Sequence, residues 1–429
     1  MTKTQDVFLI DGARTPFLKV RGKRGPFTPV DLAVQCGRPL LARQPFSADA
    51  FDMVILGCVN VIADEMNPAR VAALRLGMGD AMVAFTVQIN CGSGMQSIDT
   101  AFRTIREGSG DLILAGGAEA LSHAPLVLQD DAVDWLAGMQ TASGPLATAQ
   151  NALQIRPKHL KPVVGLERGL TDPITDMSMG QTAELLAHHF GITRSMADTY
   201  AVESHTRLAA AQQDGTFAHE VLPAFDRDGN VYCDDDGVRA DSSVDKLRGL
   251  KPVFEKPYGQ VTAGNSSQVT DGASWCILAS ADAVKAHDLT PIARLVDSEW
   301  AALDPSVMGL GPVMSVTPLL SRHGYGVADV DLWEINEAFA AQVLACLAAW
   351  QDPRFCRDVL GLDDSFGVIP RDKLNIHGGA IALGHPVGTS GNRIVLHLAN
   401  ALKATGARRG VATECIGGGQ GGAMILEAV

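Results

Sequence analysis

The sequence predicts an α/β protein of two similar halves, in which strands of parallel sheets pack between helices. Apolar stretches that end in glycine-rich turns recur in the order strand, loop, helix in two distant parts of the chain. Apolar residues make up 46% and charged residues 19% of the 429 residues, so a large buried core is available. Glycine, with 44 residues, provides positions where the backbone turns with positive φ or comes close to a neighbour.

The first copy of this plan begins with the apolar stretch 51–61, which is typical of a buried strand. A second strand is predicted at 85–90, and it runs directly into Cys91 and the turn C-G-S-G. The helix predicted after this turn has one apolar face at helical spacing, made of Met95, Ile98, Phe102 and Ile105. A buried strand at 111–115 completes the unit.

The second copy begins with a predicted strand at 329–335, which ends at Asn336. A later helix has an apolar face made of Ile394, Leu398, Ala401 and Leu402. The predicted strand 410–414 then ends at Cys415, and the stretch 423–429 predicts a last strand. The matching order of elements in both halves favours a duplicated α/β architecture.

A polar segment interrupts this plan and predicts a separate unit. We expect an N-terminal half at 1–121 that is completed by about 251–288, and a C-terminal half at 289–429. The intervening residues 122–250 are predicted to form an inserted loop domain that covers a pocket. It contains one clear helical pair at 179–213, whose second helix has Thr193 as its N-cap, after Gly191 has ended the first.

Charge and composition exclude several classes of function. The formal net charge of −13 argues against a nucleic-acid partner, because phosphate binding needs a basic face. Eight cysteines without a C-x-x-C pair indicate a reducing compartment, and neither a secretory signal nor a membrane span is visible, so we expect a cytoplasmic protein. The acidic triplet 234–236 is predicted to be a solvated turn, not a metal site, and the basic stretch 156–161 a plain surface.

Two cysteines occupy positions suited to nucleophilic chemistry. Cys91 lies where a strand meets a helix N-terminus, and there the helix dipole favours a thiolate. A small buried hydrophobe is the structural alternative for such a cysteine. Cys415 also ends a strand, and the glycine run that follows is no dinucleotide loop, because a strand and not a helix comes next. Together they indicate a nucleophile and an acid/base.

Three further side chains lie at ends of predicted strands or in tight loops. His385 is held between Gly384 and Pro386, and an imidazole near a thiol can generate the thiolate, although a structural role is the commoner one. Asn336 is a neutral donor suited to a developing oxyanion or an ordered water. Glu337 is either catalytic or a carboxylate that caps and orients its neighbours.

At this point the residues match a known family. The sequence resembles the thiolases, CoA-dependent enzymes that split or form the bond α to a thioester carbonyl. Seven motifs carry the resemblance in the family's order over most of the chain: N-C-G-S-G-M at 90–95, G-G-A-E at 116–119, M-G-Q-T-A-E at 179–184, T-A-G-N-S-S-Q-V-T-D-G-A at 262–273, N-E-A-F-A at 336–340, G-G-A-I-A-L-G-H-P-x-G-x-S-G at 378–391 and C-I-G-G-G-Q-G at 415–421.

The resemblance implies a layered αβαβα fold of two halves with mixed sheets, and a role for each matching residue. Cys91 would be the acylated nucleophile, and Cys415 would protonate the leaving enolate. His385 would activate Cys91 and, with Asn336 and a water, form one oxyanion hole. The N–H groups of Cys91 and Gly417 would form the second.

The resemblance also implies how the substrate is held. Ser267 matches a position along the CoA pantetheine, and Met179 and Gly180 match the part of the loop domain that faces the same tunnel. Coenzyme A and acetyl-CoA would be substrates, with no tightly bound cofactor and no metal. The resemblance further implies a homodimer or homotetramer, and leaves a hydratase/dehydrogenase subunit as a possible partner.

Some positions depart from the commonest thiolase pattern. Many members have Asn at the position of His377 and His at the position of Ser178. The stretch between Asn336 and Gly378 is long, and with the extended region 125–175 it resembles the long-chain trifunctional-type branch. These loop segments leave the acyl length open.

The function expected from this resemblance is reversible thiolytic cleavage of 3-ketoacyl-CoA in fatty-acid β-oxidation, by an acetyl-CoA C-acyltransferase. Two alternatives stay open at this point. One is a short-chain acetoacetyl-CoA thiolase that works in condensation, an acetyl-CoA C-acetyltransferase. The other is a non-catalytic protein of thiolase-like fold that binds lipids or CoA esters. The presence of all four expected catalytic residues disfavours this last alternative.

Overall fold

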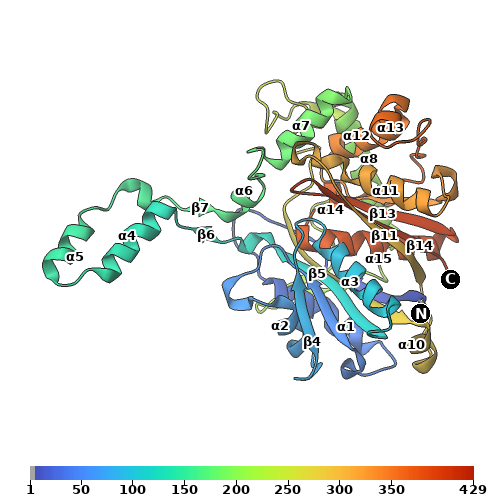
Figure 1. Cartoon of the computed structure of the whole chain (residues 1–429), viewed down its shortest axis with the longest axis horizontal. Coiled ribbons are helices and arrows are strands. Elements are labelled where there is room, and N and C mark those ends of the chain that lie inside the picture. Colours follow the sequence, from blue (N-terminus) through green and yellow to red (C-terminus); the bar gives the residue numbers. More distant parts are fainter. Residues whose placement is uncertain (1–4) are drawn as a thin grey trace.

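The computed structural model describes residues 5–429 (Figure 1). Within this range a ten-stranded sheet forms the frame of the molecule, in the order β12-β13-β14-β11-β1-β10-β5-β3-β4, with β2 paired to β10. Its strands are β1 (Val7–Arg14), β2 (Leu18–Lys19), β3 (Met53–Gly57), β4 (Val83–Val87), β5 (Leu112–Ala120), β10 (Thr270–Ser280), β11 (Ala293–Ala302), β12 (Leu332–Ile335), β13 (Arg409–Ile416) and β14 (Gln420–Glu427).

The two halves contribute equivalent mixed sheets, and these sheets are continuous. In the N-terminal half β3 pairs in parallel with β4 and β5, whereas β10 runs antiparallel to β5 and β1. In the C-terminal half β12 and β13 are parallel, and β14 runs antiparallel to β13 and β11. A short antiparallel ladder between β1 and β11 joins the halves. The mixed sheets are therefore as expected, but they form one sheet.

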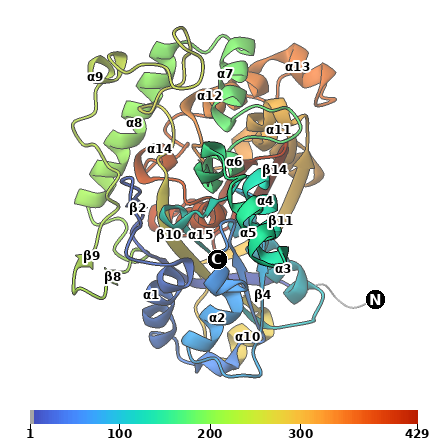
Figure 2. The ribbon, with the colours of Figure 1, turned by 90° about the vertical axis from the view of Figure 1, so that its left-hand side faces the viewer.

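Two central helices lie between the two halves of this sheet (Figures 1 and 2). They are α3 (Ser93–Arg106) and α15 (Val387–Thr405), which pack on one another and on strands of both halves. On the outer faces lie α1 (Pro29–Ala42) and α2 (Pro68–Arg75) in one half, and α11 (Gly311–Arg322) and α12 (Ala340–Gln351) in the other.

Alternating side chains along the strands show why the layers form. On β3, Ile55 packs with the central helices, whereas its neighbours Val54 and Leu56 pack with α1 and α2. On β13, Ala412 faces the central layer and Val411 faces α11 and α12. Successive strand residues point to opposite faces, so a strand buried on both sides is apolar throughout. This burial produces the predicted αβαβα layering.

Several predicted boundaries shift, for local reasons. The strand predicted at 85–90 ends at Val87, because Asn90 takes a left-handed φ of 47° and turns the chain. The strand predicted at 51–61 is confined to β3. The strand predicted at 329–335 is only β12, because the Asp329 carboxylate accepts a hydrogen bond from the Gly326 amide, 2.9 Å away, and closes a helical turn.

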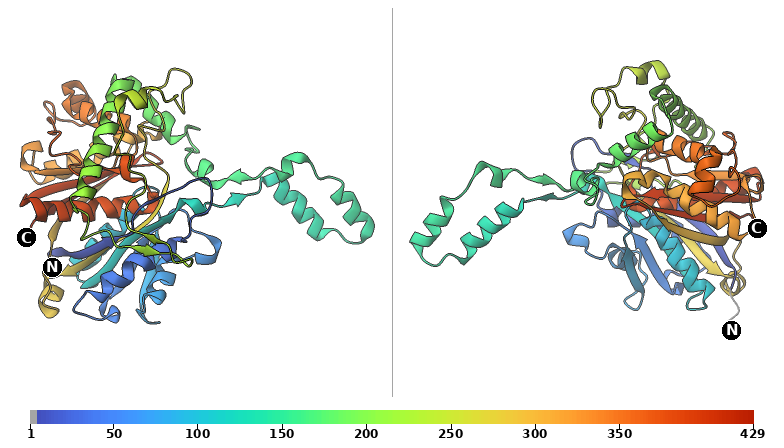
Figure 3. Two further views of the ribbon diagram at one scale, coloured as in Figure 1. Left: turned by 180° about the vertical axis from the view of Figure 1, so that it is seen from behind. Right: turned by 45° about the horizontal axis from the view of Figure 1, so that its top comes forward.

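Residues 122–250 contain the predicted helical pair and an arm. The pair is α7 (Met179–His189) and α8 (Arg194–Gln213), and Thr193 caps α8 as expected. The arm begins with the ladder of β6 (Leu126–Val127) and β7 (Val163–Val164). Beyond it, α4 (Asp130–Thr141) and α5 (Pro145–Ala152) project far from the body (Figure 3). The basic stretch 156–161 lies on this arm and is exposed except at His159.

The prediction that the acidic triplet 234–236 is a solvated turn is wrong for one of its three residues. Asp234 and Asp236 are exposed, but Asp235 is buried and is no part of a solvated turn. Its carboxylate accepts two hydrogen bonds from the Arg14 guanidinium, at 2.7 and 2.9 Å, and one from the Phe17 amide. No group of side chains in the described range could hold a metal ion. Likewise, none of the helices between residues 5 and 429 has the length and apolar character of a membrane span.

Candidate active site

The loop that carries Cys91 is braced on both sides. Asn90 precedes it with a left-handed backbone, a conformation that Asn tolerates better than most residues. The Asn90 carboxamide donates to the Gly417 carbonyl at 2.8 Å, so the loop is tied to the turn after Cys415. The Ser93 hydroxyl accepts from the Ile89 amide at 2.9 Å and closes the loop. Cys91 is thereby held just before the N-terminus of α3.

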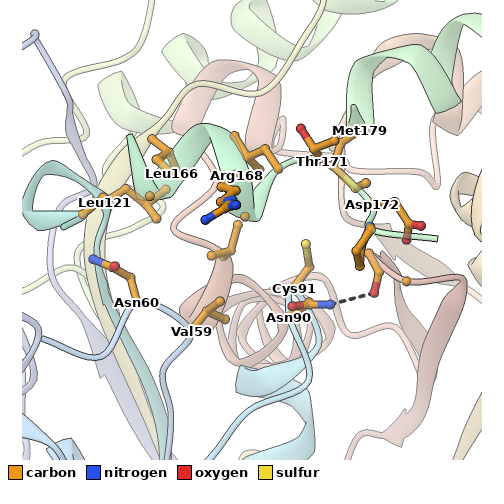
Figure 4. Close-up of a pocket in the computed structure, with 18 of the residues that line it drawn as sticks. Val59, Asn60, Asn90, Cys91, Leu121, Leu166, Arg168, Thr171, Asp172 and Met179 are labelled. Atoms are coloured by element: carbon orange, nitrogen blue, oxygen red, sulfur yellow. Dashed lines mark hydrogen bonds between the residues drawn. The ribbon is translucent and has the colours of Figure 1, made fainter. Parts of the chain in front are cut away.

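Cys91 lines a cavity of about 550 Å³ (Figure 4). Met179 and Gly417, two of the residues that the sequence predicts at the site, line the same cavity. The wall is largely apolar, and several of its residues come from the segment at the base of the arm: Gly165, Leu166, Arg168, Gly169, Leu170, Thr171, Asp172, Pro173 and Ile174. The inserted segment therefore shapes the space in front of Cys91.

The two cysteine thiols are close enough to influence one another. Burial raises the pKa of Cys91 to about 12, and the Glu414 carboxylate adds to this rise, while the Gly417 amide lowers it. Burial and the neighbouring Cys91 raise the pKa of Cys415 well above its ordinary value. Burial therefore outweighs the helix dipole that was expected to favour a thiolate at Cys91. Both thiols are protonated at neutral pH, and a base must take the Cys91 proton before the sulfur can attack.

His385 and Asn336 form the second group at the site. Burial lowers the pKa of His385 to about 4, and Arg393 adds to this effect, so the imidazole is neutral. Its Nδ1 lies 2.6 Å from the Ser390 hydroxyl and 3.5 Å from the Asn336 amide nitrogen. The His385 Nε2 and the Asn336 Oδ1 are buried without a hydrogen-bond partner within the described part of the chain. Val387, two residues further on, lines the Cys91 cavity.

This arrangement leaves the His385 Nε2 free to take part in proton transfer. The Ser390 hydroxyl lies 3.2 Å from the Pro386 carbonyl, to which it donates. The same hydroxyl can then accept a hydrogen bond from Nδ1–H, and in that tautomer Nε2 carries the lone pair. An unpaired buried nitrogen is costly unless it serves a partner, and this geometry suits a general base.

Glu337 is a positioning residue and does not face the cavity. Its buried carboxylate accepts hydrogen bonds from the hydroxyls of Tyr200 and Ser204, at 3.0 and 2.6 Å. It also accepts from the Asn375 amide at 2.9 Å and the Ile381 amide at 3.2 Å. These contacts join α8 to the segment that leads to His385. Of the two roles left open for Glu337, the orienting one agrees with these contacts.

Ser267 and Gly180 lie elsewhere around the site. The Ser267 amide donates to the Ala338 carbonyl at 2.9 Å, which places it beside the Asn336 segment. At Gly180 an added Cβ would meet the Phe254 ring at 2.1 Å, so only glycine permits this packing. Neither residue lines the Cys91 cavity. Their contact with CoA stays a prediction.

Some residues of the site escaped the sequence analysis. The buried carboxylate of Glu119 accepts hydrogen bonds from the amides of Val59, Asn60 and Gly388, and burial raises its pKa to about 7. Its place in the G-G-A-E motif was a usable signal. Arg168, by contrast, lies in a polar stretch where nothing in the local pattern marks a residue that lines a cavity.

Comparisons with known proteins agree with the fold and the motifs. The profile "Thiolase, N-terminal domain" matches residues 7–282, and "Thiolase, C-terminal domain" matches residues 289–428. The chain is 38% identical to the beta-ketoadipyl-CoA thiolase of Pseudomonas aeruginosa, over 99% of this chain and 100% of that protein. It is 37% identical to the mitochondrial 3-ketoacyl-CoA thiolase of Bos taurus, over 100% of this chain and 99% of that protein.

Solved structures agree as well. The acetyl-CoA acetyltransferase of Bacillus anthracis superposes with a TM-score of 0.86 at 34% identity, over 100% of both chains. Human mitochondrial 3-ketoacyl-CoA thiolase in complex with CoA superposes with a TM-score of 0.85 at 35% identity, over 99% of this chain and 98% of that chain. The chain therefore belongs to the thiolase family of acyltransferases, whose substrates include CoA.

Proposed function

We propose that this protein cleaves 3-ketoacyl-CoA reversibly to acyl-CoA and acetyl-CoA, through an acyl-enzyme on Cys91. The observation that carries the proposal is the position of the Cys91 thiol, on the wall of a cavity of about 550 Å³, with the Gly417 amide directed at its sulfur. A nucleophile beside a preorganised N–H donor is the arrangement that acyl transfer requires.

The first half-reaction uses two proton carriers: His385 accepts the proton of the nucleophile, and Cys415 donates a proton to the leaving enolate. The Cys91 sulfur attacks the 3-keto carbonyl carbon, and its proton passes to the His385 Nε2. The bond between C2 and C3 then breaks, and its electron pair remains on the thioester as an enolate. The Cys415 thiol donates its proton to C2, so acetyl-CoA leaves and the acyl group stays on Cys91.

The second half-reaction reverses the proton movements. A CoA thiol gives its proton to the Cys415 thiolate, and its sulfur attacks the acyl carbonyl on Cys91. The Cys91–acyl bond breaks, and the leaving sulfur regains a proton from His385. Acyl-CoA is released and both thiols are protonated again. Because the carbon–carbon cleavage and the thioester exchange are both reversible, the same residues also serve condensation.

Because the catalytic groups are neutral at rest, the site avoids the desolvation cost of a buried charge. A thiol and an imidazole that are both uncharged at rest can be held together in an apolar site without the desolvation cost of an ion pair. Charge appears only as the reaction proceeds, on the sulfur and on the carbonyl oxygen. The Gly417 amide and the Asn336 segment supply the hydrogen bonds that stabilise it.

The direction and setting of the reaction are further parts of the proposal. Relatives named beta-ketoadipyl-CoA thiolase and 3-ketoacyl-CoA thiolase support cleavage in fatty-acid or acyl-CoA breakdown, and the acetyl-CoA acetyltransferases among the similar proteins keep acetoacetyl-CoA synthesis as the second candidate. Coenzyme A would bind from solution as a substrate, with no tightly bound cofactor, in the cytoplasm. A hydratase/dehydrogenase subunit would supply 3-ketoacyl-CoA to a multienzyme form.

The assembly proposed is at least a homodimer. Strand β4 is the last strand on one side of the sheet, and Val83 on it is 56% exposed. An unpaired edge strand next to the Cys91 loop invites pairing with a second copy. Light scattering at micromolar concentration should report at least twice the chain mass of 45.2 kDa. A mass of one chain would contradict this.

The experiment that tests the function is to trap the intermediate. The wild-type protein is incubated with isotopically labelled acetyl-CoA, quenched in acid, and weighed intact. We expect one acetyl group per chain, located on the peptide that contains Cys91, together with CoA-dependent cleavage of 3-ketoacyl-CoA. An adduct on Cys415 would reverse the two roles, and the absence of any adduct and of cleavage would refute the mechanism.

A further inference from the structure

We propose that Arg168 makes the acyl end of the active-site cavity a carboxylate-binding subsite. The preferred substrates would then be 3-ketoacyl-CoA thioesters whose acyl chain ends in a carboxylate. This inference rests on the proposed thiolytic function, and it names the substrate class of the same site.

Arg168 enters the cavity from the base of the arm. It lies in α6 (Gly165–Gly169), which follows β7 and precedes the helical pair. Figure 4 shows its guanidinium hanging from α6 into the space between Asn60 and Cys91, above Val59. All four residues line the cavity, and Arg168 is exposed. The cation and the nucleophile therefore share one chamber.

The charge of Arg168 has no partner in the described structure. None of the ion pairs between residues 5 and 429 includes it, although fourteen other arginines are paired. Asp172, the only acidic residue of the cavity wall, is engaged elsewhere. Its Oδ1 accepts hydrogen bonds from the amides of Ile174 and Thr175 and from the Thr175 hydroxyl.

The charge of Arg168 contrasts with the composition of the rest of the cavity wall. Most of the other lining residues are apolar or lack a charge, and Arg168 is the only basic one. A chain that ends in a methyl group offers the guanidinium no hydrogen-bond acceptor. A carboxylate matches the guanidinium fork with two parallel hydrogen bonds. The chamber therefore favours an acyl chain with an anionic end.

The phosphates of CoA are the other source of an anionic oxygen group. The acyl carboxylate is favoured, because Arg168 opens into the same chamber as Cys91, where the acyl group must be transferred. The pantetheine arm keeps the phosphates distant from the reacting thioester. Met179, which is predicted to face the CoA tunnel, lines this cavity as well, so the KM for CoA is measured in the same test.

The test compares three substrates with the full-length protein. They are 3-oxoadipyl-CoA, which ends in a carboxylate, 3-oxohexanoyl-CoA, which has the same length and a methyl end, and acetoacetyl-CoA. The variants are Arg168→Met, which removes the charge, and Arg168→Lys, which keeps the charge and loses the fork. Arg156→Met is the matched control, because Arg156 is exposed on the arm and does not line the cavity.

We expect the wild type to prefer 3-oxoadipyl-CoA over 3-oxohexanoyl-CoA. Arg168→Met should lower kcat/KM for 3-oxoadipyl-CoA by roughly 10- to 100-fold, the factor carried by a charge-assisted hydrogen bond, with most of the loss in KM. Arg168→Lys should recover part of it, and Arg156→Met should match the wild type. Turnover of 3-oxohexanoyl-CoA by Arg168→Met should stay within about threefold of wild type.

Two results would overturn the inference while the thiolase function stands. One is a wild type without preference for the carboxylate end. The other is an equal loss on all three substrates with a raised KM for CoA, which would assign Arg168 to a CoA phosphate. Cleavage of none of the three would instead refute the proposed function.

A binding measurement supports the assignment independently of turnover. Adipyl-CoA and hexanoyl-CoA are compared as protectants of Cys91 against iodoacetamide, in the wild type and in Arg168→Met. We expect adipyl-CoA to protect the wild type at the lower concentration and to lose this advantage in the variant. Equal protection by both thioesters in the wild type would overturn the carboxylate subsite.

Discussion

The two cysteine junctions of this molecule begin alike and end differently. Cys91 follows β4, and Cys415 lies next to the last residue of β13, where the structure extends the predicted strand to Ile416; each leads into glycines. The Cys91 junction continues into α3, and its cysteine is partly exposed on the wall of a cavity. The Cys415 junction continues through a tight turn into β14, and its cysteine is buried among α7, α12 and their neighbours. The same residue type at the same kind of position therefore acquires two different environments.

The difference between the two environments explains why Cys91 suits the role of nucleophile and Cys415 the role of proton carrier. A nucleophile needs access for a bulky substrate, and the Cys91 junction offers this access on the cavity wall. A proton carrier needs only a short path to one carbon atom and protection from other electrophiles. The buried Cys415 hairpin meets that need. Four predictions test this division of roles.

The largest effect is expected for Cys91→Ser. A hydroxyl is far less acidic than a thiol, and no stronger base is present to compensate, so acylation should stop. We expect kcat for thiolysis to fall by about 10³–10⁵-fold, with no acetyl adduct in the intact mass. Retention of a labelled adduct in this variant would place the nucleophile elsewhere.

Cys415→Ser should give a smaller and more selective loss. Acetylation of Cys91 by acetyl-CoA should persist at a reduced rate, because the nucleophile and His385 remain. Carbon–carbon cleavage should fall by about 10²–10⁴-fold, because the enolate then lacks its proton donor. Intact mass and steady-state rates measure the two halves separately. Equal losses in both would show that Cys415 does not act on the enolate alone.

Alkylation kinetics should separate the two thiols across pH. The pKa of Cys91 is raised to about 12, so its thiolate fraction rises tenfold for each pH unit between 7 and 9. The rate of alkylation by iodoacetamide should therefore increase about 100-fold over this range without a plateau. Cys415, whose pKa is also raised and whose thiol is buried, should stay unmodified in the folded protein. A plateau below pH 8 would contradict a Cys91 thiol that is protonated at neutral pH.

The smallest effect is expected at the link between the junctions. Asn90→Ala removes the 2.8 Å hydrogen bond to the Gly417 carbonyl and places a Cβ without polar support at a left-handed φ. We expect kcat to fall by about tenfold and the free energy of unfolding to fall by about 1–2 kcal/mol.

Asn90→Gly is the matched control for that variant. Glycine restores the backbone conformation without restoring the hydrogen bond. It should recover most of the unfolding free energy, measured by urea titration, but not the rate. Equal behaviour of the two variants in both assays would show that the link to Gly417 does not position the catalytic turn.

The sequence by itself determined those features of the structure that depend on neighbouring residues. The apolar face of α3 was predicted residue by residue, because helical spacing requires that those side chains share one side. The N-cap of α8 was predicted from Thr193 and Gly191, whose roles depend on their immediate neighbours. The thiol chemistry at Cys91 and Cys415 was also visible, because strand ends and glycine turns are local patterns.

Only the tertiary structure decided the features that depend on distant partners. The local sequence predicts that Asp235 is a surface residue. In the fold it is buried, because Arg14, 221 positions away, donates a hydrogen bond to its carboxylate. Glu337 becomes a positioning residue through Tyr200 and Ser204. Arg168 shares a cavity with Cys91 because the segment between β7 and α7 contributes to the cavity wall. Periodicity and capping act over one or two turns of chain, whereas burial and charge pairing are set by the whole fold.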